Sequence, residues 1–509
     1  MAKIRFKILV LAVLAAVSWS ATPARAADIG KAEALLKSGN YPQAAQLFFA
    51  VYSAPRSRIE RAKAEWGLGR SLQQMGLLYS ASKYYSVIVR RGKTGANPYF
   101  RQAMEQLGII NSAVSLGQSH IVQLFKSKIN SADVPGPARG FYFYYQGIEA
   151  FDQRKLEIAS SQFEKVPSGS SYYLGAQFYL GVISNLSGSH SKAINHFEKV
   201  INGSKGEESL REMHELALMN IARIHYETKR YQQALGFYGR VPRDSDHWLD
   251  AVWETSWAYY MMEKFNNTLG QIHTIHSPFF MNRFYPESYI LQSITFLRLC
   301  RFDQVKESMK RFRDRYAQTY SEIKAMLSRF QGNHKEFFSL VYRYKNGQLK
   351  QFKNAEEVVK KLTLIDAFKG AVDIMRIADR EADRLSDYKG SWGNSGLYQQ
   401  LDEFLKSKKE SAISRSGREM YKLAATYYSQ LLELSNQTKF IVAEMQLGKL
   451  AKLRSKISVT DQDKKTQYIG GMQKLNIGET LEYWPFEQEY WEDELGFYVY
   501  NLDSKCTGN

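Results

Sequence analysis

The sequence predicts an all-α protein, in which a superhelix of about seven or eight helical hairpins continues into a long-helix extension. One observation is a pair of small residues twelve positions apart, recurring in units that begin 34 to 41 residues apart, with one 78-residue gap. Another is a large side chain four residues after each second member. Repetition at this period is typical of a helical solenoid. The pairs are Ala32/Ala44, Gly69/Ala81, Gly147/Ala159, Gly181/Ala193, Ala222/Ala234, Ser256/Thr268 and Ser293/Val305.

The small residues are explained by the close packing of two helices. Glycine inside a helix costs about 1 kcal/mol relative to alanine, so Gly69, Gly147 and Gly181 indicate places where two antiparallel helices approach closely. The large residue one turn after the second small residue lies on the same helix face. We expect it to fill the space between one hairpin and the next. The 78-residue gap has room for one further, degenerate copy around residues 100–135.

These positions resemble the tetratricopeptide repeat. In that family the first helix carries Trp, Leu, Gly or Ala, and Tyr, and the second carries Ala, Phe or Tyr, and Ala. The best matches are residues 64–89 (AEWGLGRSLQQMGLLYSASKYYSVIV) and 177–201 (QFYLGVISNLSGSHSKAINHFEKVI). The resemblance covers roughly residues 28–318 and implies a concave surface, formed mostly by the first helices, that binds peptides or helices of a partner.

Residues 1–26 are typical of a secretory signal peptide. Lys3, Arg5 and Lys7 precede an apolar run, and Ala24-Arg25-Ala26 gives a cleavage site before Ala27. The run is too short to cross a bilayer, although a retained anchor is the alternative. We therefore expect a periplasmic protein with no integral membrane span in the mature chain.

The chain is strongly basic, with a formal net charge of +18. The signal peptide holds four of these positive charges and no acidic residue, so the mature chain carries 18 − 4 = +14. Such a charge is common in nucleic-acid-binding proteins, but export argues against nucleic acid as a partner. Acidic proteins, lipid headgroups or cell-wall polymers are the anionic partners that remain.

Four segments follow from these patterns: 1–26 as signal peptide, 27–320 as solenoid, 321–465 as helical extension and 466–509 as an aromatic and acidic C-terminal segment. In the extension, apolar residues recur at helical intervals over 355–385 and 397–457. Two or three long helices, packed within the chain, fit this pattern best, and a coiled coil with a partner is the alternative.

The C-terminal segment differs in kind, because residues 483–498 read YWPFEQEYWEDELGFY. So many large rings are too apolar for a disordered tail. The segment either caps the last helices or docks on a partner, with its rings as anchors and its acids setting the register. It could also fold back on the basic stretches Arg301–Arg315 and Arg343–Lys361.

This tail resembles the C-terminal segment of exported tetratricopeptide proteins from gliding and predatory Gram-negative bacteria. Some of those are assigned to adventurous gliding-motility machinery. The resemblance implies a component of an envelope-associated complex.

Cys300 and Cys506 are the two cysteines of the chain. In an oxidising compartment they could pair and tie the chain's end to the last repeat, or they could remain free thiols. Two cysteines cannot by themselves build a metal site.

The sequence offers no catalytic, cofactor-binding or metal-binding residues. His273 and His276 lie three apart without an acid to complete a metal set. The motifs HExxH, GxSxG and GxxxxGK[ST] are missing. We therefore expect a protein without enzymatic activity.

The leading interpretation is a scaffold or adaptor that binds protein partners through its concave surface and its tail. The alternative is a protein that binds peptidoglycan or another cell-wall carbohydrate through aromatic stacking. If the groove is basic, binding of an acidic partner should fall steeply with added salt. The candidate partner-binding residues are Arg70, Gln73, Gln177, Arg223, Tyr226, Tyr260, Trp484, Phe486, Tyr490 and Trp491.

Overall fold

The computed structural model describes residues 28–126, 129–348, 352–458 and 490–506, and the regular secondary structure in these ranges is helical throughout. The predicted signal peptide lies outside the described residues. The all-α prediction is confirmed. The helices of the repeat region are α1 (Ile29–Lys37), α2 (Tyr41–Ser53), α3 (Arg58–Gln74), α4 (Leu78–Arg91), α5 (Phe100–Ala113), α6 (Gln118–Phe125), α7 (Arg139–Asp152), α8 (Leu156–Glu164), α9 (Tyr173–Leu186), α10 (His190–Ser204), α11 (Arg211–Glu227), α12 (Tyr231–Tyr238), α13 (Trp248–Met261), α14 (Phe265–Ile275), α15 (Glu287–Arg298) and α16 (Phe302–Arg329).

Each twelve-spaced pair falls on the two helices of one packed hairpin, from α1 with α2 to α15 with α16. Helices α5 and α6 occupy the 78-residue gap, where α5 packs on α4 and α6 packs on α7. The prediction of helical hairpins is therefore confirmed for the seven pairs. Two helices occupy the place of the predicted degenerate copy, but they pack on their neighbours rather than on each other as a hairpin.

The turn of each of these seven hairpins has the same backbone form. The residue seven positions after the first small residue has φ between +51° and +83°. In the first hairpin, Gly39 N–H and Asn40 N–H donate to the carbonyls of Leu36 and Leu35, which is a Schellman motif. A residue with a left-handed backbone conformation at this position ends the first helix and reverses the chain, so that the second helix begins within a few residues. The seven residues are Gly39, Gly76, Arg154, Gly188, Lys229, Glu263 and Cys300.

The buried glycines are covered by rings from the second helix. A Cβ on Gly147 would lie 2.6 Å from Phe163, and one on Gly181 would lie 2.8 Å from Phe197. These rings cover the glycine of their own hairpin, and Phe163 also reaches the next hairpin, where its ring stacks on Tyr179 with 5.0 Å between centroids. Phe48 likewise fills the space between hairpins, because its ring lies on Gly67 of the next hairpin.

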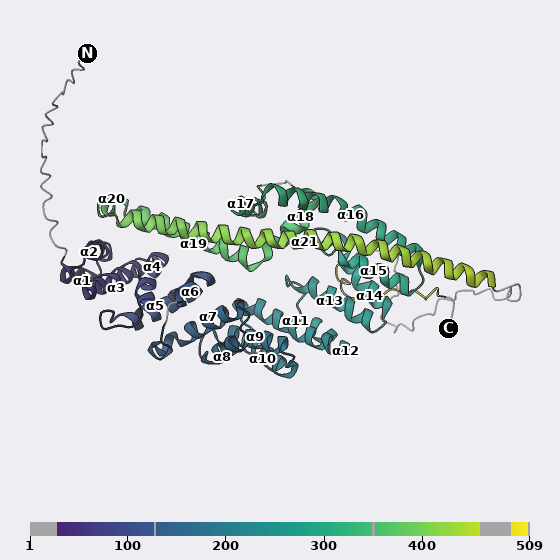
Figure 1. Ribbon diagram of the computed structural model, residues 1–509, viewed down its shortest axis with the longest axis horizontal. Helices are drawn as coiled ribbons and strands as arrows, with labels where there is room; N and C mark the ends of the chain where they lie inside the picture. The colour runs from purple at the N-terminus through teal and green to yellow at the C-terminus, as the bar shows by residue number, and fades with distance from the viewer. Residues whose placement is uncertain (1–27, 127–128, 349–351, 459–489, 507–509) are drawn as a thin grey trace, which may run out of the picture.

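The extension folds back along the repeats. It consists of α17 (His334–Lys345), α18 (Glu356–Leu364), α19 (Asp366–Ser386), α20 (Lys389–Trp392) and the 62-residue helix α21 (Leu397–Ser458). Figure 1 shows the hairpins following a curved path while α21 runs nearly straight from the first hairpins to the last. Helix α21 packs on α19, α17, α16 and α15, and also on α4. Residue 320, the expected end of the solenoid, lies inside α16.

Trp392 and Glu381 join the extension to the first hairpins. The buried Trp392 indole donates to the carbonyl of Pro42 at 3.2 Å. The buried Glu381 carboxylate accepts the backbone N–H groups of Tyr79 and Ser80 at 2.8 and 2.7 Å. These N–H groups lie in the first turn of α4, where no residue of the same helix can accept them. A side chain about 300 positions away in sequence therefore caps α4.

We expect the turn residues Gly188 and Lys229 to respond in opposite directions. Nothing lies within 4 Å of a Cβ built on Gly188, so Gly188→Ala should cost about 1 kcal/mol through left-handed strain alone. Lys229→Gly should raise stability by a smaller amount, because glycine relieves the same strain but loses more entropy on folding. Thermal unfolding of both variants checks this, and shifts of equal sign would contradict it.

Glu381→Gln should destabilise the protein by about 1–3 kcal/mol, since an amide has one acceptor oxygen and its NH₂ group would face a backbone donor. The control is Asp379→Asn on the same helix. Asp379 is 55% exposed and pairs with Lys409, so its loss should change stability by less than about 0.5 kcal/mol. Denaturant unfolding compares the two, and equal costs would show that Glu381 has no special role.

Candidate partner-binding site

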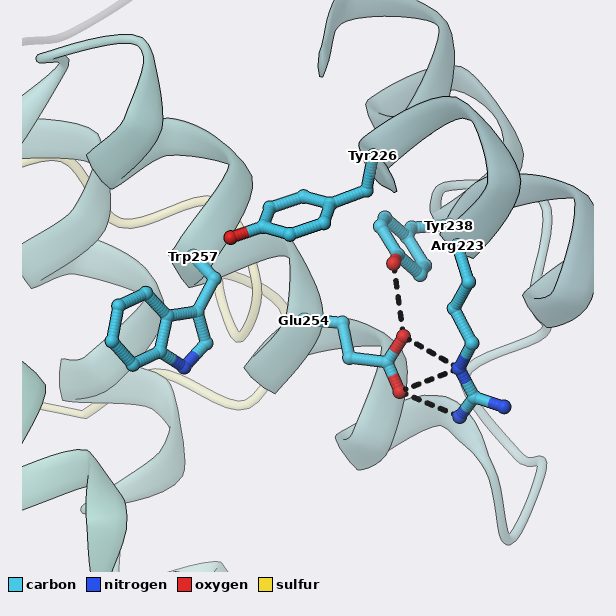
Figure 2. Close-up of a pocket in the computed structure, with 5 residues that line it drawn as sticks. All are labelled: Arg223, Tyr226, Tyr238, Glu254 and Trp257. Atoms are coloured by element: carbon cyan, nitrogen blue, oxygen red, sulfur yellow. Dashed lines mark hydrogen bonds and ion pairs between the residues drawn. The ribbon is translucent and has the colours of Figure 1, made fainter. Parts of the chain in front are cut away.

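A pocket of about 350 Å³ opens between α11, α12 and α13. Figure 2 shows its five lining residues. Arg223 and Tyr226 come from α11, the first helix of one hairpin, and Glu254 and Trp257 come from α13, the first helix of the next. Tyr238 reaches in from α12. The pocket thus lies where two successive repeats meet.

An ion pair forms one wall of the pocket. Arg223 Nη2 lies 2.6 Å from Glu254 Oε1, and Arg223 Nε lies 2.9 Å from Glu254 Oε2, which is a bidentate arrangement. The Tyr238 hydroxyl donates to Glu254 Oε2 at 2.9 Å. Burial, reinforced by the Glu254 carboxylate, raises the pKa of Tyr238, so its hydroxyl remains a donor at neutral pH. Because the two charges are paired, this wall of the pocket carries little net charge.

The aromatic rings form the other wall. Tyr226 and Trp257 are half-buried and face the pocket from opposite sides (Figure 2). Trp257 continues an aromatic row on α13, with Trp253 and Tyr260 at ring distances of 5.9 and 5.8 Å. Large half-exposed rings beside an Arg are typical of binding hot spots. The pocket suits an apolar or aromatic anchor from a partner.

The remaining solenoid residues predicted to bind partners lie apart from this pocket. Gln73 donates to Gln106 and accepts from Tyr85, and Arg70 lies 5.9 Å from the Trp66 ring. Gln177 is buried and bonded to His196. Tyr260 lies near the pocket, at the end of the α13 row. The structure thus brings together Arg223 and Tyr226 in the pocket, and Tyr260 contacts the pocket residue Trp257.

Sequence reasoning missed three of the pocket residues. Trp257 follows its small residue Ser256 by one position, as Arg223 follows Ala222, so the repeat register is the signal that identifies it. Tyr238 is one of the large residues of the repeat. Glu254 gives no signal, because only the folded structure shows that it lies against Arg223 of the previous hairpin.

The C-terminal residues 490–506, which we call the strap, lie along α14. The Tyr490 ring stacks on His273 with 4.2 Å between centroids. Gln271 donates to the carbonyl of Gly496 at 2.7 Å, and Asn266 exchanges two hydrogen bonds with the backbone of Leu502. This part of the tail therefore docks on its own solenoid. Trp484 and Phe486 lie outside the described residues, whereas the Trp491 side chain is 51% exposed.

The strap ends in a disulfide between Cys506 and Cys300, with the Cα atoms 5.0 Å apart. Of the two alternatives left open by the sequence, the structure has the bonded form. Arg301 contacts the strap as expected of the basic stretch, but it donates to the backbone carbonyl of Asp503. The acceptor in this contact is therefore a main-chain carbonyl and not an acidic side chain.

The described residues contain no group of three or more His, Cys, Asp or Glu side chains that could hold a metal ion. In the same residues, every helix is too short or too polar to cross a membrane.

No protein-family model and no curated protein matches this sequence. Among solved structures, the chain is similar to the apo form of RapI, with 9% identity and a TM-score of 0.33, over 75% of this chain and 96% of that one. It is also similar to a Rap protein complexed with competence and sporulation factor, with 10% identity and a TM-score of 0.27, over 75% and 98% of the two chains. At these TM-scores, the likeness does not assign this chain to the Rap proteins.

Beneath the strap, His276 should make stability depend on pH. Its ring stacks on Tyr289 and bonds Ser288 at 2.7 Å, and burial, with nearby arginines, lowers its pKa to about 3. Because the unfolded pKa is near 6.5, the stabilising contribution is complete above that pH. It is lost as the pH falls from 6.5 toward 3, by up to about 1.4 kcal/mol per pH unit.

His276→Gln should therefore flatten the fall in stability between about pH 6.5 and pH 4, relative to the unsubstituted chain. Denaturant unfolding at a series of pH values measures this difference. Parallel curves for the two proteins would contradict it.

Proposed function

We propose that the protein is a non-catalytic scaffold of the tetratricopeptide type, which binds protein partners within an envelope-associated complex of the periplasm. The observation that carries the proposal is the pocket between α11 and α13. There, Tyr226 and Trp257 stand half-exposed beside a fixed ion pair, in a position repeated along the first helices of a hairpin array. Extended arrays of this kind offer long binding surfaces.

The proposed location is supported by two features. The N-terminal residues have the pattern of a signal peptide. The Cys300–Cys506 disulfide is of the kind that persists in oxidising compartments such as the periplasm. Gliding-motility machinery is the envelope process that the resemblance of the tail favours, and we include it in the proposal on that ground.

Binding at the pocket should depend on apolar contact more than on charge. Because Glu254 neutralises Arg223, the pocket offers no uncompensated cation to an acidic partner. The sequence-based expectation of a steep salt dependence therefore does not apply to this pocket. We propose that a partner inserts an apolar or aromatic side chain between Tyr226 and Trp257.

The proposal can be tested by placing a photo-crosslinking phenylalanine analogue at Tyr226 in living cells and identifying the captured protein by mass spectrometry. Trp257→Ala in the same chain should abolish the crosslink. With the purified partner, it should weaken binding about 30-fold, as expected for a hot spot worth about 2 kcal/mol. The control is the exposed Ile109 of α5, which is 57% exposed and lies outside the pocket. The analogue at Ile109 should not capture this partner, and Ile109→Ala should not alter binding.

Two results would overturn the proposal. One is an identical crosslinked product from both positions, since the capture would then be independent of the pocket. The other is co-sedimentation with isolated peptidoglycan that Trp257→Ala abolishes, in the absence of any protein crosslink. That outcome would favour the cell-wall alternative.

A further inference from the structure

The strap builds one side of a second hollow, of about 550 Å³, which lies against the start of α13 and the short 3₁₀ helix η4 (Pro278–Phe280). This strap hollow combines residues from three separate parts of the chain. They are Arg243, Trp248, Phe279, Phe280, Glu492, Asp493 and Leu495.

Arg243 fastens the strap at this place. Its guanidinium donates to the backbone carbonyls of Glu492, Asp493 and Leu495 at 2.8, 3.1 and 2.9 Å. The same group lies 5.6 Å from the centre of the Trp248 ring and 5.7 Å from that of Phe497. The Arg243 guanidinium thus donates to main-chain oxygens of the strap and not to the carboxylates of Glu492 and Asp493.

The strap carboxylates point to a cationic ligand. Glu492, Asp493 and Glu494 are consecutive and exposed, and none of them forms an ion pair within the described part of the chain. Three negative charges within one turn repel each other, and a cation that approaches all three relieves this repulsion. The whole chain has a net charge of +18, so these three acids form a locally negative region on a basic protein.

Large apolar side chains surround the acids. Phe279 is 51% exposed, Trp491 is 51% exposed and Phe497 is 73% exposed. Phe279 lines the hollow, and Trp491 and Phe497 belong to the same strap as the acids. Exposed rings next to charged side chains are typical of a protein interaction surface. A ligand that matches this surface has basic residues at its rim and an aromatic or aliphatic anchor at its centre.

We infer that the strap hollow binds a cationic segment of a partner protein, with an apolar side chain in the hollow and lysines or arginines against Glu492, Asp493 and Glu494. This inference rests on the proposed scaffold function and deepens it, since it gives the chemistry of one partner. The surface is separate from the pocket of α11 and α13. Among the described residues, Arg243 is the one positive charge that lines the hollow, and the three carboxylates outnumber it. Salt screens the positive charges that lie beyond about 8 Å at physiological ionic strength.

The test uses a fluorescein-labelled peptide in which lysines flank two tryptophans, and its matched peptide with glutamates in place of the lysines. Fluorescence anisotropy with the full chain should show binding of the lysine peptide alone, weakened by added salt. The double variant Glu492→Lys with Asp493→Lys should weaken this binding at least about tenfold. Glu207→Lys with Glu208→Lys makes the same change of net charge on the exposed turn before α11 and should have no such effect.

A second pair of variants tests whether the strap itself builds the site. Gly270 of α14 lies so close to the carbonyl of Tyr498 that a Cβ would overlap it, so Gly270→Ala must displace the strap. Gly236 occupies the equivalent position of α12, and a Cβ placed there would have no neighbour within 4 Å, so Gly236→Ala is the control. Peptide binding should be lost in the first variant and kept in the second, with far-ultraviolet circular dichroism unchanged in both.

Equal weakening by the two charge variants, or a preference for the glutamate peptide, would overturn the inference. So would full binding by a folded Gly270→Ala protein, because the strap would then be irrelevant to the site. A failed crosslink at Tyr226 together with a positive peptide result would refute the proposed pocket and leave the strap surface standing. The reverse pair of results would refute this inference alone.

Discussion

The shape of the molecule depends on a buried contact between α19 and the start of α4. Helix α4 begins without a capping side chain of its own, so its first N–H groups need an acceptor. Glu381 supplies both oxygens, and its charge is favourable at the positive end of the helix. Lys408 of α21 lies 4.5 Å from the Tyr79 ring and donates to the carbonyl of Leu116. One polar cluster, enclosed by apolar packing, thus holds the extension against the second and third units.

The packing of the extension along the repeats restricts the flexibility of the hairpin array. In an open solenoid each unit contacts only its neighbours, and the array can flex along its length. Here α21 joins the first hairpins to the last over about 93 Å, at 1.5 Å per residue. Lys369 at the start of α19 also pairs with Glu212 of α11 at 3.1 Å. Of the helices that line the pocket, α11 is thus linked to the extension by a half-exposed ion pair.

The repeat pattern predicts the hairpins well because their packing is local. Gly147 and Phe163 lie 16 residues apart and meet within one hairpin, so the constraint is visible in sequence. The contacts of Glu381 with Tyr79 and of Arg223 with Glu254 have no such period. The first depends on how α19 and α21 cross the repeats, and the second on the angle between successive hairpins. Sequence therefore predicts Arg223 and Tyr226 as candidates, whereas Glu254 becomes visible only in the folded chain.

The strap shows how one repeat becomes different from the others. Gly236 and Gly270 occupy the same register on α12 and α14, yet only Gly270 is covered by a second segment of chain. Asn266 and Gln271, which bond the strap backbone, make α14 the helix that receives it. The disulfide to Cys300 then holds the strap at its far end. The contacts to α14 use main-chain atoms together with the rings of Tyr490 and Tyr498, whereas the side chains of Trp491, Phe497 and the three acids remain exposed. The tail thus caps the solenoid with its backbone and two tyrosine rings and keeps other side chains available for recognition, so the two alternatives for its role are compatible.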